Sequence, residues 1–237
     1  LYIKYMDKNK DVEKIIRTVK ELFIQNKCNR RGLSEAIDSY LVPQELEKKT
    51  NAEVSTPFKL RQEMLDRIPE NFWKKRQKVF EPCSGKGGFL IDIIDRFMKG
   101  LKDEIKDEEK RYKIIVEDCL YFSDINSINI FISKLLLDPE DKYKLKYNEG
   151  NTLELSVKEK WDVDGFDAII GNPPYQTQVG PKKTQPLWNL FTKKYLDSLT
   201  ENGYLLFVHP SGWRSPVGVF RDVYDKILDK NLLYLNM

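Results

Sequence analysis

Short apolar runs alternate with helix-like segments from residue 78 to residue 208, and this alternation limits the possible folds more than any other feature. The runs that predict strands lie at 79–80, just before Asp124, at 144–149, at 166–170 and at 204–208. The segments whose apolar residues recur at helical spacing are 89–98, 128–137 and 187–199. Strands that alternate with helices need crossover connections, which favour parallel strand pairs. We therefore expect an α/β fold with a mostly parallel central sheet, helices on both faces and a buried strand at 204–208.

The chain before this alternation has a different pattern. Apolar residues at helical spacing predict an N-terminal helical segment within 1–50. Pro57 then opens a further helix, expected at 58–67. We divide the chain into this helical segment and a main domain at 51–237. Within the main domain, we expect the charged segment 99–113 to be a surface loop or a helix end.

Residue composition argues against several classes of protein. Three cysteines without CxxC spacing and a single histidine argue against a disulfide framework and against a metal site. No apolar run approaches the roughly 18 residues that a membrane span needs, and no signal peptide is visible. We therefore expect no membrane association and a cytoplasmic protein in a reducing, intracellular setting. The net charge of +3, from 40 basic and 37 acidic residues, permits a nucleic-acid partner without favouring one. Because the chain begins with Leu1 and not with Met, we expect a segment of a longer protein.

A glycine-rich loop, EPCSGKGGF at 81–89, follows the first predicted strand and opens a helix. Open parallel sheets bind ligands outside the carboxyl ends of their strands, so this loop predicts a small-molecule site, with a simple tight turn as the alternative. The phosphate-loop pattern fails because no Ser or Thr follows Lys86, and Leu90 breaks the dinucleotide pattern. Glu81 would repel a pyrophosphate and suits a ligand with an ammonium group.

A second acid, Asp124, ends the next predicted strand. An acid at this position can accept both hydrogens of a ribose diol. The alternative is a helix N-cap. Glu81, Asp124 and the helix N-terminus together specify a ligand with an amine, a ribose and a carboxylate. S-adenosylmethionine has all three groups.

The tetrapeptide Asn172-Pro173-Pro174-Tyr175 follows the apolar run at 166–170. An Asn, two prolines and an aromatic ring at the carboxyl end of a strand form a rigid polar cup with a flat wall. Such a cup suits a planar group that carries an exocyclic amine. The polar residues 176–178 come next, and we expect them to form a mobile loop over the site.

These motifs, in this order, resemble the amino-methyltransferases that modify adenine N6 in DNA, in the subgroup whose target-recognition region is C-terminal. The resemblance covers roughly residues 52–215, and it includes 187–191 and 207–213 as later active-site motifs. It implies a Rossmann-like S-adenosylmethionine-dependent methyltransferase fold and a set of cofactor-binding residues. That set is Thr56, Pro57, Glu81, Pro82, Cys83, Gly85, Gly87, Phe89, Asp124, Ile125, Asn151, Thr152 and Asn172. Two members depart from the family pattern, since Glu81 and Asn151 each stand where Asp is usual.

The resemblance also implies a reaction, in which adenine flipped out of duplex DNA receives the methyl group. The expected catalytic residues are Asn172, Pro173, Pro174 and Tyr175. The Asn172 oxygen and the Pro173 carbonyl would accept the two amine N–H groups, and Tyr175 would stack on the base. Trp213 is a candidate for a second contact with the base, and a core position is its alternative. Expected partners are double-stranded DNA and a restriction endonuclease or recognition subunit, with the target-recognition region absent or truncated here.

Two other functions compete with this one. A protein glutamine N5-methyltransferase of the release-factor type shares the Asn-Pro-Pro-Tyr cup, because a primary amide is also planar and bears an amine. A noncatalytic cofactor-binding subunit is the other alternative. The upstream Thr56-Pro57 motif, and the end of the chain where a recognition region would begin, favour DNA as the substrate.

Overall fold

The computed structural model describes residues 55–236 except 181, 182 and 216. It also describes residues 17, 18, 21, 24, 25, 29 and 31–35. Most of the predicted N-terminal helical segment therefore lies outside the described residues. Within it, residues 31–35 are helical.

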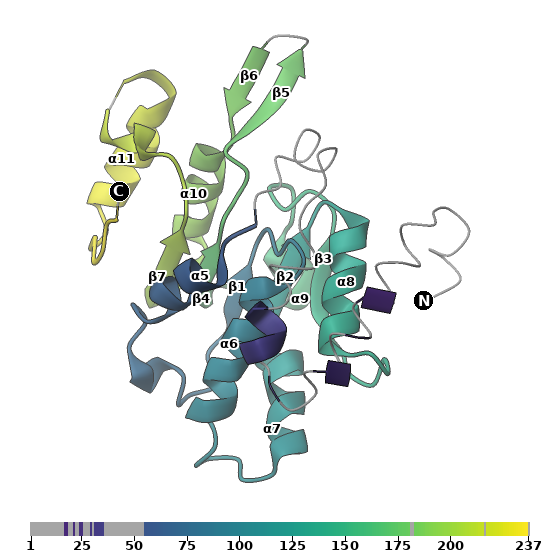
Figure 1. Cartoon of the computed structure of the whole chain (residues 1–237). Coiled ribbons are helices and arrows are strands. Elements are labelled where there is room, and N and C mark those ends of the chain that lie inside the picture. Colours follow the sequence, from purple (N-terminus) through teal and green to yellow (C-terminus); the bar gives the residue numbers. More distant parts are fainter. Residues whose placement is uncertain are drawn as a thin grey trace.

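A five-stranded sheet forms the centre of the molecule, and all its strand pairs are parallel (Figure 1). The strand order is β3-β2-β1-β4-β7. The strands are β1 (Val79–Glu81), β2 (Leu120–Asp124), β3 (Lys146–Glu149), β4 (Phe166–Gly171) and β7 (Leu199–Phe207). The predicted parallel sheet is thus confirmed, with each predicted strand present.

Helices cover both faces of this sheet, as the alternation in the sequence predicted. The α-helices are α5 (Phe58–Leu65), α6 (Gly88–Gly100), α7 (Glu108–Ile114), α8 (Ser127–Leu137), α9 (Val157–Trp161), α10 (Trp188–Asp197) and α11 (Arg221–Leu228). Shorter helical turns are η1 (Glu70–Phe72), η2 (Ile115–Cys119), η3 (Ser211–Arg214) and η4 (Gly218–Phe220). Within the described part of the chain, every helix is too short or too polar to traverse a bilayer.

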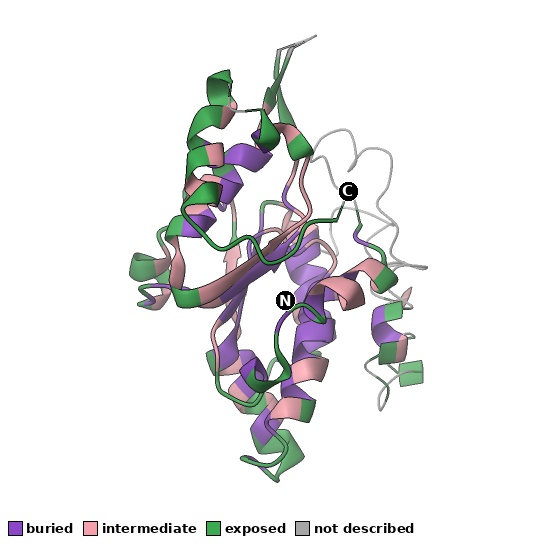
Figure 2. Cartoon of the chain, turned by 90° about the vertical axis from the view of Figure 1, so that its left-hand side faces the viewer, coloured by how far each residue is buried: buried purple, intermediate pink, exposed green. Residues whose placement is uncertain are grey.

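The period-two alternation of the strands divides the apolar residues into two cores. Val79 in β1 points into a cluster with the apolar faces of α6 and α8, while its neighbour Phe80 points into a cluster with α10. Figure 2 shows the buried residues concentrated along the sheet and on the helix faces that meet it. Each fully buried Leu, Ile or Phe stabilises the fold by about 1.5–3 kcal/mol.

The segment 99–113 contains a helix that the sequence analysis did not resolve. α7 begins after Asp107, whose carboxylate accepts a 2.6 Å hydrogen bond from the Lys110 N–H. Glu108 and Glu109 occupy its first turn, where acids favour the positive end of the helix dipole. These local capping signals define the helix, and its short length left too little periodicity to reveal it.

The prediction of a buried strand at 204–208 was partly wrong. β7 begins five residues earlier, at Leu199, and its residues are half-buried or exposed. The reason is its position at the edge of the sheet, where only β4 pairs with it. Asn202, with φ 62°, lies within the strand and does not introduce it.

A two-stranded antiparallel hairpin separate from the central sheet replaces the loop predicted at 176–178. It consists of β5 (Gln176–Gly180) and β6 (Lys183–Pro186), with Thr177 paired with Gln185. Polar side chains on both faces hid these strands, because no apolar alternation marks them. In Figure 1 the hairpin projects beyond the end of the sheet.

The strand order creates a switch point between β1 and β4. From β1 the chain runs outward through β2 to β3, and it then returns to the other side of β1 as β4. Crevices outside the carboxyl ends of strands at such a point are the usual ligand sites of open α/β sheets. The glycine-rich loop follows β1, and the Asn-Pro-Pro-Tyr tetrapeptide follows β4, so both predicted motifs flank this point.

Candidate active site

The glycine-rich loop turns sharply at two glycines. Gly85 and Gly87 have φ values of +50° and +85°, which side chains other than glycine rarely adopt. A Cβ on Gly87 would also lie 3.2 Å from Ser133 Oγ in α8. These constraints bring the N-terminus of α6 to the carboxyl edge of the sheet, the edge at which the carboxyl ends of the parallel strands lie.

Asp124 joins this loop to the end of β2. Its Oδ2 accepts a 2.8 Å hydrogen bond from the Gly85 N–H, and its Oδ1 accepts one of 2.8 Å from the Asn126 N–H. The N-cap of α8 is Asn126, which accepts from the Ile128 N–H, so Asp124 does not have the capping role considered as an alternative.

Thr152, in the segment after β3, links that segment to the end of β2 and to the loop after β1. Its hydroxyl donates a 2.9 Å hydrogen bond to the Pro82 carbonyl and lies 2.7 Å from Ser123 Oγ. The Thr152 side chain is buried in these contacts, and it therefore holds these segments together. Asn151 beside it is exposed, and its Oδ1 accepts a 3.1 Å hydrogen bond from the Leu153 N–H.

Two residues of α10 hold the turn that follows Asn151, and sequence analysis missed both. Lys194 Nζ donates to the carbonyls of Thr152, Leu153 and Leu155 at 3.1, 2.8 and 2.8 Å. The Tyr195 hydroxyl donates to the Thr152 carbonyl at 3.0 Å. Partial burial lowers the pKa of Lys194 from its usual value. The Lys193-Lys194 pair in the sequence carries no signal for this role, because the contact spans about 40 residues.

Glu81 is the most unusual group of the site. Its side chain is 2% exposed, and within the described residues Oε2 has no hydrogen-bond partner. Burial raises the pKa of Glu81 well above its usual value; the nearby Arg61 charge opposes this shift, and Asp124 adds to it. A buried carboxylate oxygen without a hydrogen-bond partner is costly, and a cationic ligand that donates to it would relieve that cost.

Arg61 in α5 connects the N-terminal part of the site to the glycine-rich loop. Its Nε donates to Asp92 Oδ2 at 2.6 Å, and its Nη1 donates to the Thr56 carbonyl at 2.5 Å. Nη2 donates to Ser34 Oγ at 2.7 Å, which ties the helical residues 31–35 to the same guanidinium. Thr56 is buried by these contacts, and Pro57 after it is exposed.

The cup lies directly beside Glu81. A Cβ built on Gly171, the last residue of β4, would be 3.5 Å from Pro82 Cδ and 4.0 Å from Glu81 Cγ. Asn172 follows, half-buried, and then Pro173, buried. Tyr175 is half-buried, and this raises the pKa of its hydroxyl. The end of β4 therefore brings the tetrapeptide to the position where the glycine-rich loop leaves β1.

An aromatic stack supports the wall of the cup. The Trp188 ring stacks on His209 with centroids 5.0 Å apart and planes 8° apart, and it also stacks on Phe220 at 5.2 Å. The backbone N–H of Trp188 donates to the Tyr175 carbonyl at 3.4 Å. Burial lowers the pKa of His209, and its Nδ1–H donates to the Pro210 carbonyl at 2.9 Å. His209 is thus part of this stack, and its burial there favours the neutral form.

Several predicted residues occupy positions other than those expected of ligand contacts. Phe89 is buried in the core between the sheet and α6, and Trp213 is buried with Trp188 and Val223. Trp213 therefore has the core position that was its alternative. Burial, with the charges of Asp124 and Glu81, raises the pKa of Cys83, which keeps its thiol protonated. Ile125, in contrast, is 64% exposed beside Asp124, an unusual exposure for an aliphatic side chain at a sheet edge.

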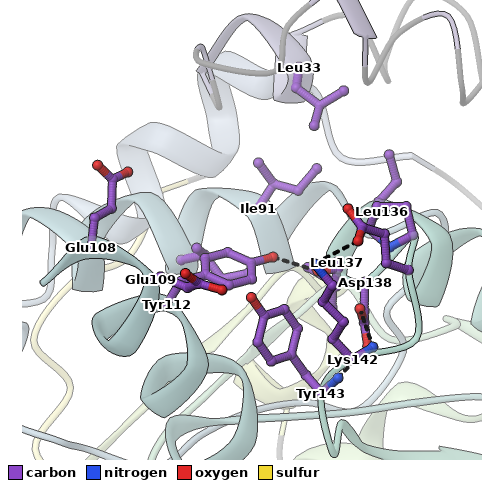
Figure 3. A pocket seen from close by; sticks show the side chains of 13 residues that line it. Leu33, Ile91, Glu108, Glu109, Tyr112, Leu136, Leu137, Asp138, Lys142 and Tyr143 are labelled. Carbon is purple, nitrogen blue, oxygen red and sulfur yellow. Dashed lines mark hydrogen bonds and ion pairs between the residues drawn. The ribbon is translucent and has the colours of Figure 1, made fainter.

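A cavity of about 440 Å³ lies elsewhere, between α6, α7 and the end of α8 (Figure 3). Ile91, Leu136 and Tyr143 are among the side chains that line it, together with Leu33 from the N-terminal part. None of the predicted site residues lines this cavity. In the described residues there is also no group of three or more side chains that could hold a metal ion.

Comparison with known proteins identifies relatives. The family model described as Eco57I restriction-modification methylase matches residues 4–234. A putative type II restriction enzyme and methyltransferase of Methanocaldococcus jannaschii is 23% identical over 93% of this chain, which spans only 19% of that protein.

Solved structures show the same fold. A modification subunit of a putative type I restriction enzyme from Vibrio vulnificus has a TM-score of 0.57 at 20% identity, covering 83% of this chain and 42% of its own. A putative class I S-adenosylmethionine-dependent methyltransferase from Listeria monocytogenes has a TM-score of 0.52 at 14% identity, covering 94% and 80%. The chain therefore has the Rossmann-like fold of S-adenosylmethionine-dependent methyltransferases.

Proposed function

Because this chain belongs to the Eco57I restriction-modification methylase family, we propose that it transfers a methyl group from S-adenosylmethionine to the N6 amine of adenine in DNA. The chain spans about a fifth of the length of its curated relative, so the activity, substrate and partners of the whole protein are all part of this proposal. We assign the catalytic part to residues 51–237 and treat residues 1–50 as an attached helical segment. Double-stranded DNA is the proposed partner, with a restriction endonuclease or recognition subunit alongside.

The observation that carries the proposal is the buried Glu81 carboxylate next to the cup. Its Oε2 lacks a partner within the described residues, and Gly171, which precedes Asn172, packs against Glu81 and Pro82. The ammonium group of S-adenosylmethionine fits this requirement for a buried cation. A cofactor anchored there lies beside the tetrapeptide that would bind the acceptor amine.

Other residues would hold the rest of the cofactor. Asp124 Oδ2 can accept a hydrogen bond from a ribose hydroxyl, and the exposed face of Ile125 can pack against an adenine ring. Asn151, which follows β3, would accept from the adenine amine through its Oδ1, which also accepts the Leu153 N–H. The N-terminus of α6 offers N–H groups to the carboxylate. When bound, S-adenosylmethionine supplies an electrophilic methyl group on a sulfonium centre.

The cup prepares the acceptor nitrogen. Asn172 Oδ1 and the Pro173 carbonyl each accept one N–H of the substrate amine, which draws the nitrogen lone pair out of conjugation with the ring. The same two acceptors stabilise the positive charge that develops on nitrogen. No general base is required at the start, because the methylated nitrogen loses its proton readily. This agrees with a site in which His209 is a neutral part of the aromatic stack.

The amine of adenine is inaccessible within a duplex, so the base must be flipped out. Tyr175 is half-buried at the end of the cup, and it would stack on the extrahelical base. Stacking of a base on an aromatic side chain offsets about 1–3 kcal/mol of the lost base stacking.

The test uses the full-length protein with S-adenosylmethionine carrying a labelled methyl group. Genomic DNA and a peptide release factor are offered in parallel, and labelled DNA is hydrolysed to nucleosides. We expect label in N6-methyl-2′-deoxyadenosine only, and an Asn172→Ala variant that transfers methyl groups at least about a hundredfold more slowly. Label confined to the release factor would contradict the proposal in favour of glutamine methylation. Cofactor binding without any transfer would indicate a noncatalytic subunit.

A further inference from the structure

The β5–β6 hairpin has no evident role in building the core, yet it grows directly from the cup. β5 starts at Gln176, the residue after Tyr175, and the chain returns from β6 to Leu187. The Leu187 N–H donates a 3.0 Å hydrogen bond to the Tyr175 carbonyl, which closes the base of the hairpin. In Figure 1 the hairpin extends past the carboxyl edge of the sheet. Any substrate attached to a group in the cup must therefore pass near the hairpin.

The side chains of the hairpin are those of a binding surface. Gln176, Thr177 and Gln178 on β5 are exposed, and so are Thr184 and Gln185 on β6. Thr177 pairs with Gln185 and Gln178 with Thr184, so amide and hydroxyl groups lie on both faces of the ribbon. A free two-stranded hairpin is only marginally stable in water, and this one has no apolar face to bury. Its composition is explained by contacts with another molecule.

Charge and dimensions indicate which molecule. The hairpin segment 176–186 contains no Asp or Glu, so it carries no negative charge that would repel DNA phosphates. Strands of this length reach roughly 15 Å, and DNA rises about 3.4 Å per nucleotide, so the ribbon would follow about four base pairs. A two-stranded ribbon fits the major groove, where Gln side chains can hydrogen-bond to base edges.

We propose that the β5–β6 hairpin is a DNA-contacting ribbon that binds the duplex beside the flipped adenine through its amide and hydroxyl side chains. This inference rests on the proposed function, since it assigns to that function a second contact surface outside the cup. The contact holds the duplex while the adenine enters the cup. The hairpin is thus a determinant of DNA affinity, and it has no part in cofactor binding.

The experiment compares two charge-matched variants of the full-length protein. Gln178→Glu with Gln185→Glu places one isosteric negative charge on each face of the ribbon. The control, Asn71→Asp with Asn231→Asp, adds the same charge at exposed positions in η1 and after α11. A third variant, Gln178→Ala with Gln185→Ala, removes the hydrogen-bonding groups without any charge. Binding to a fluorescent 30-base-pair duplex of mixed sequence and binding to S-adenosylmethionine are measured for each.

We expect the charged hairpin variant to lose at least tenfold in DNA affinity and the neutral variant at least threefold. The control should change by less than twofold, and all three should bind the cofactor like the wild type. Unchanged DNA affinity in the neutral variant would overturn the inference, even if the charged variant binds weakly. Added negative charges can repel DNA phosphates without any direct contact between the hairpin and the DNA. The inference would likewise be overturned if the hairpin variants lost binding to a partner subunit while their DNA affinity stayed intact. Failure of the proposed function is recognised separately, by wild-type protein that transfers no label to DNA.

Discussion

The two halves of the carboxyl edge are built in different ways. On the cofactor side, the loops after β1, β2 and β3 are joined by buried hydrogen bonds through Asp124 and Thr152. On the cup side, the tetrapeptide follows one strand and is held by backbone hydrogen bonds at the Tyr175 carbonyl and by the Trp188 stack. Side chains from separate segments join the loops of the first half, whereas the tetrapeptide of the second half is one continuous segment that follows a single strand.

This difference predicts how each half should respond to substitution. A side chain that joins several loops contributes to folding and to ligand binding together. A side chain of the cup contributes to chemistry with little effect on stability. Variants that separate stability, cofactor affinity and turnover therefore test the comparison directly.

The largest effect should follow from Arg61→Met. This change leaves Asp92 buried without its 2.6 Å partner, and breaking a buried pair costs about 3–5 kcal/mol. Urea unfolding of the cofactor-free protein measures the loss. Arg76→Met is the matched control, because the Arg76–Glu104 pair is exposed and is worth at most about 1 kcal/mol. Equal losses from both variants would contradict the role given to Arg61.

The next effect is expected from Asn172→Ala, and it should appear in turnover. Loss of a preorganised hydrogen-bonding group at a reacting atom lowers kcat by about 10²–10³. The free energy of unfolding should stay within about 0.5 kcal/mol of the wild-type value. Asn148→Ala provides a comparison on the cofactor side, where Asn148 donates to Ser123 Oγ at 3.1 Å. If both variants lose turnover equally, the cup is not the catalytic half.

Glu81→Gln should weaken cofactor binding and stabilise the free protein. Hydrogen bonds to charged groups contribute about 1.5–3 kcal/mol, so the dissociation constant should rise roughly 10- to 150-fold. Isothermal titration with S-adenosylmethionine measures this, and Glu81→Asp, which keeps the charge, should lose less.

The stability effect of Glu81 has a definite sign with pH. Burial raises its pKa in the folded protein above the value in the unfolded chain. Between those two pKa values the folded state binds more protons, so stability falls as pH rises through the folded pKa. Glu81→Gln removes this dependence. The difference in Tm, variant minus wild type, should therefore grow from acidic to neutral pH; a constant difference would refute the assignment.

The smallest effect should come from the ring of Tyr175. Tyr175→Ala should lower kcat/KM for DNA by a factor that corresponds to about 1–3 kcal/mol, because the flipped base loses its stacking surface. Tyr175→Phe retains the ring and should stay within about threefold of the wild type. Steady-state kinetics with duplex DNA gives both values. A loss in Tyr175→Phe as large as in the alanine variant would point to the hydroxyl as the important group.

Local pattern accounts for most of the fold and for the position of the candidate site in it. Apolar runs at 79–80 and 166–170 predicted β1 and β4, and the motifs that follow them lie side by side at the switch point of the sheet. The roles given to Glu81 and Asn172 stay predictions, and the structure now defines the surroundings of both residues. Patterns succeed here because strand alternation and loop-forming glycines act over only a few residues.

The sequence by itself determined the α/β alternation, the parallel sheet and the order of the motifs along its carboxyl edge. The tertiary structure alone decided that Arg61 joins Ser34 to α6, that Lys194 holds the turn after Asn151, and that residues 176–186 form a projecting hairpin. The physical reason is distance along the chain. Periodicity records which face of an element is buried, whereas a polar contact between distant segments depends on how the packed elements meet.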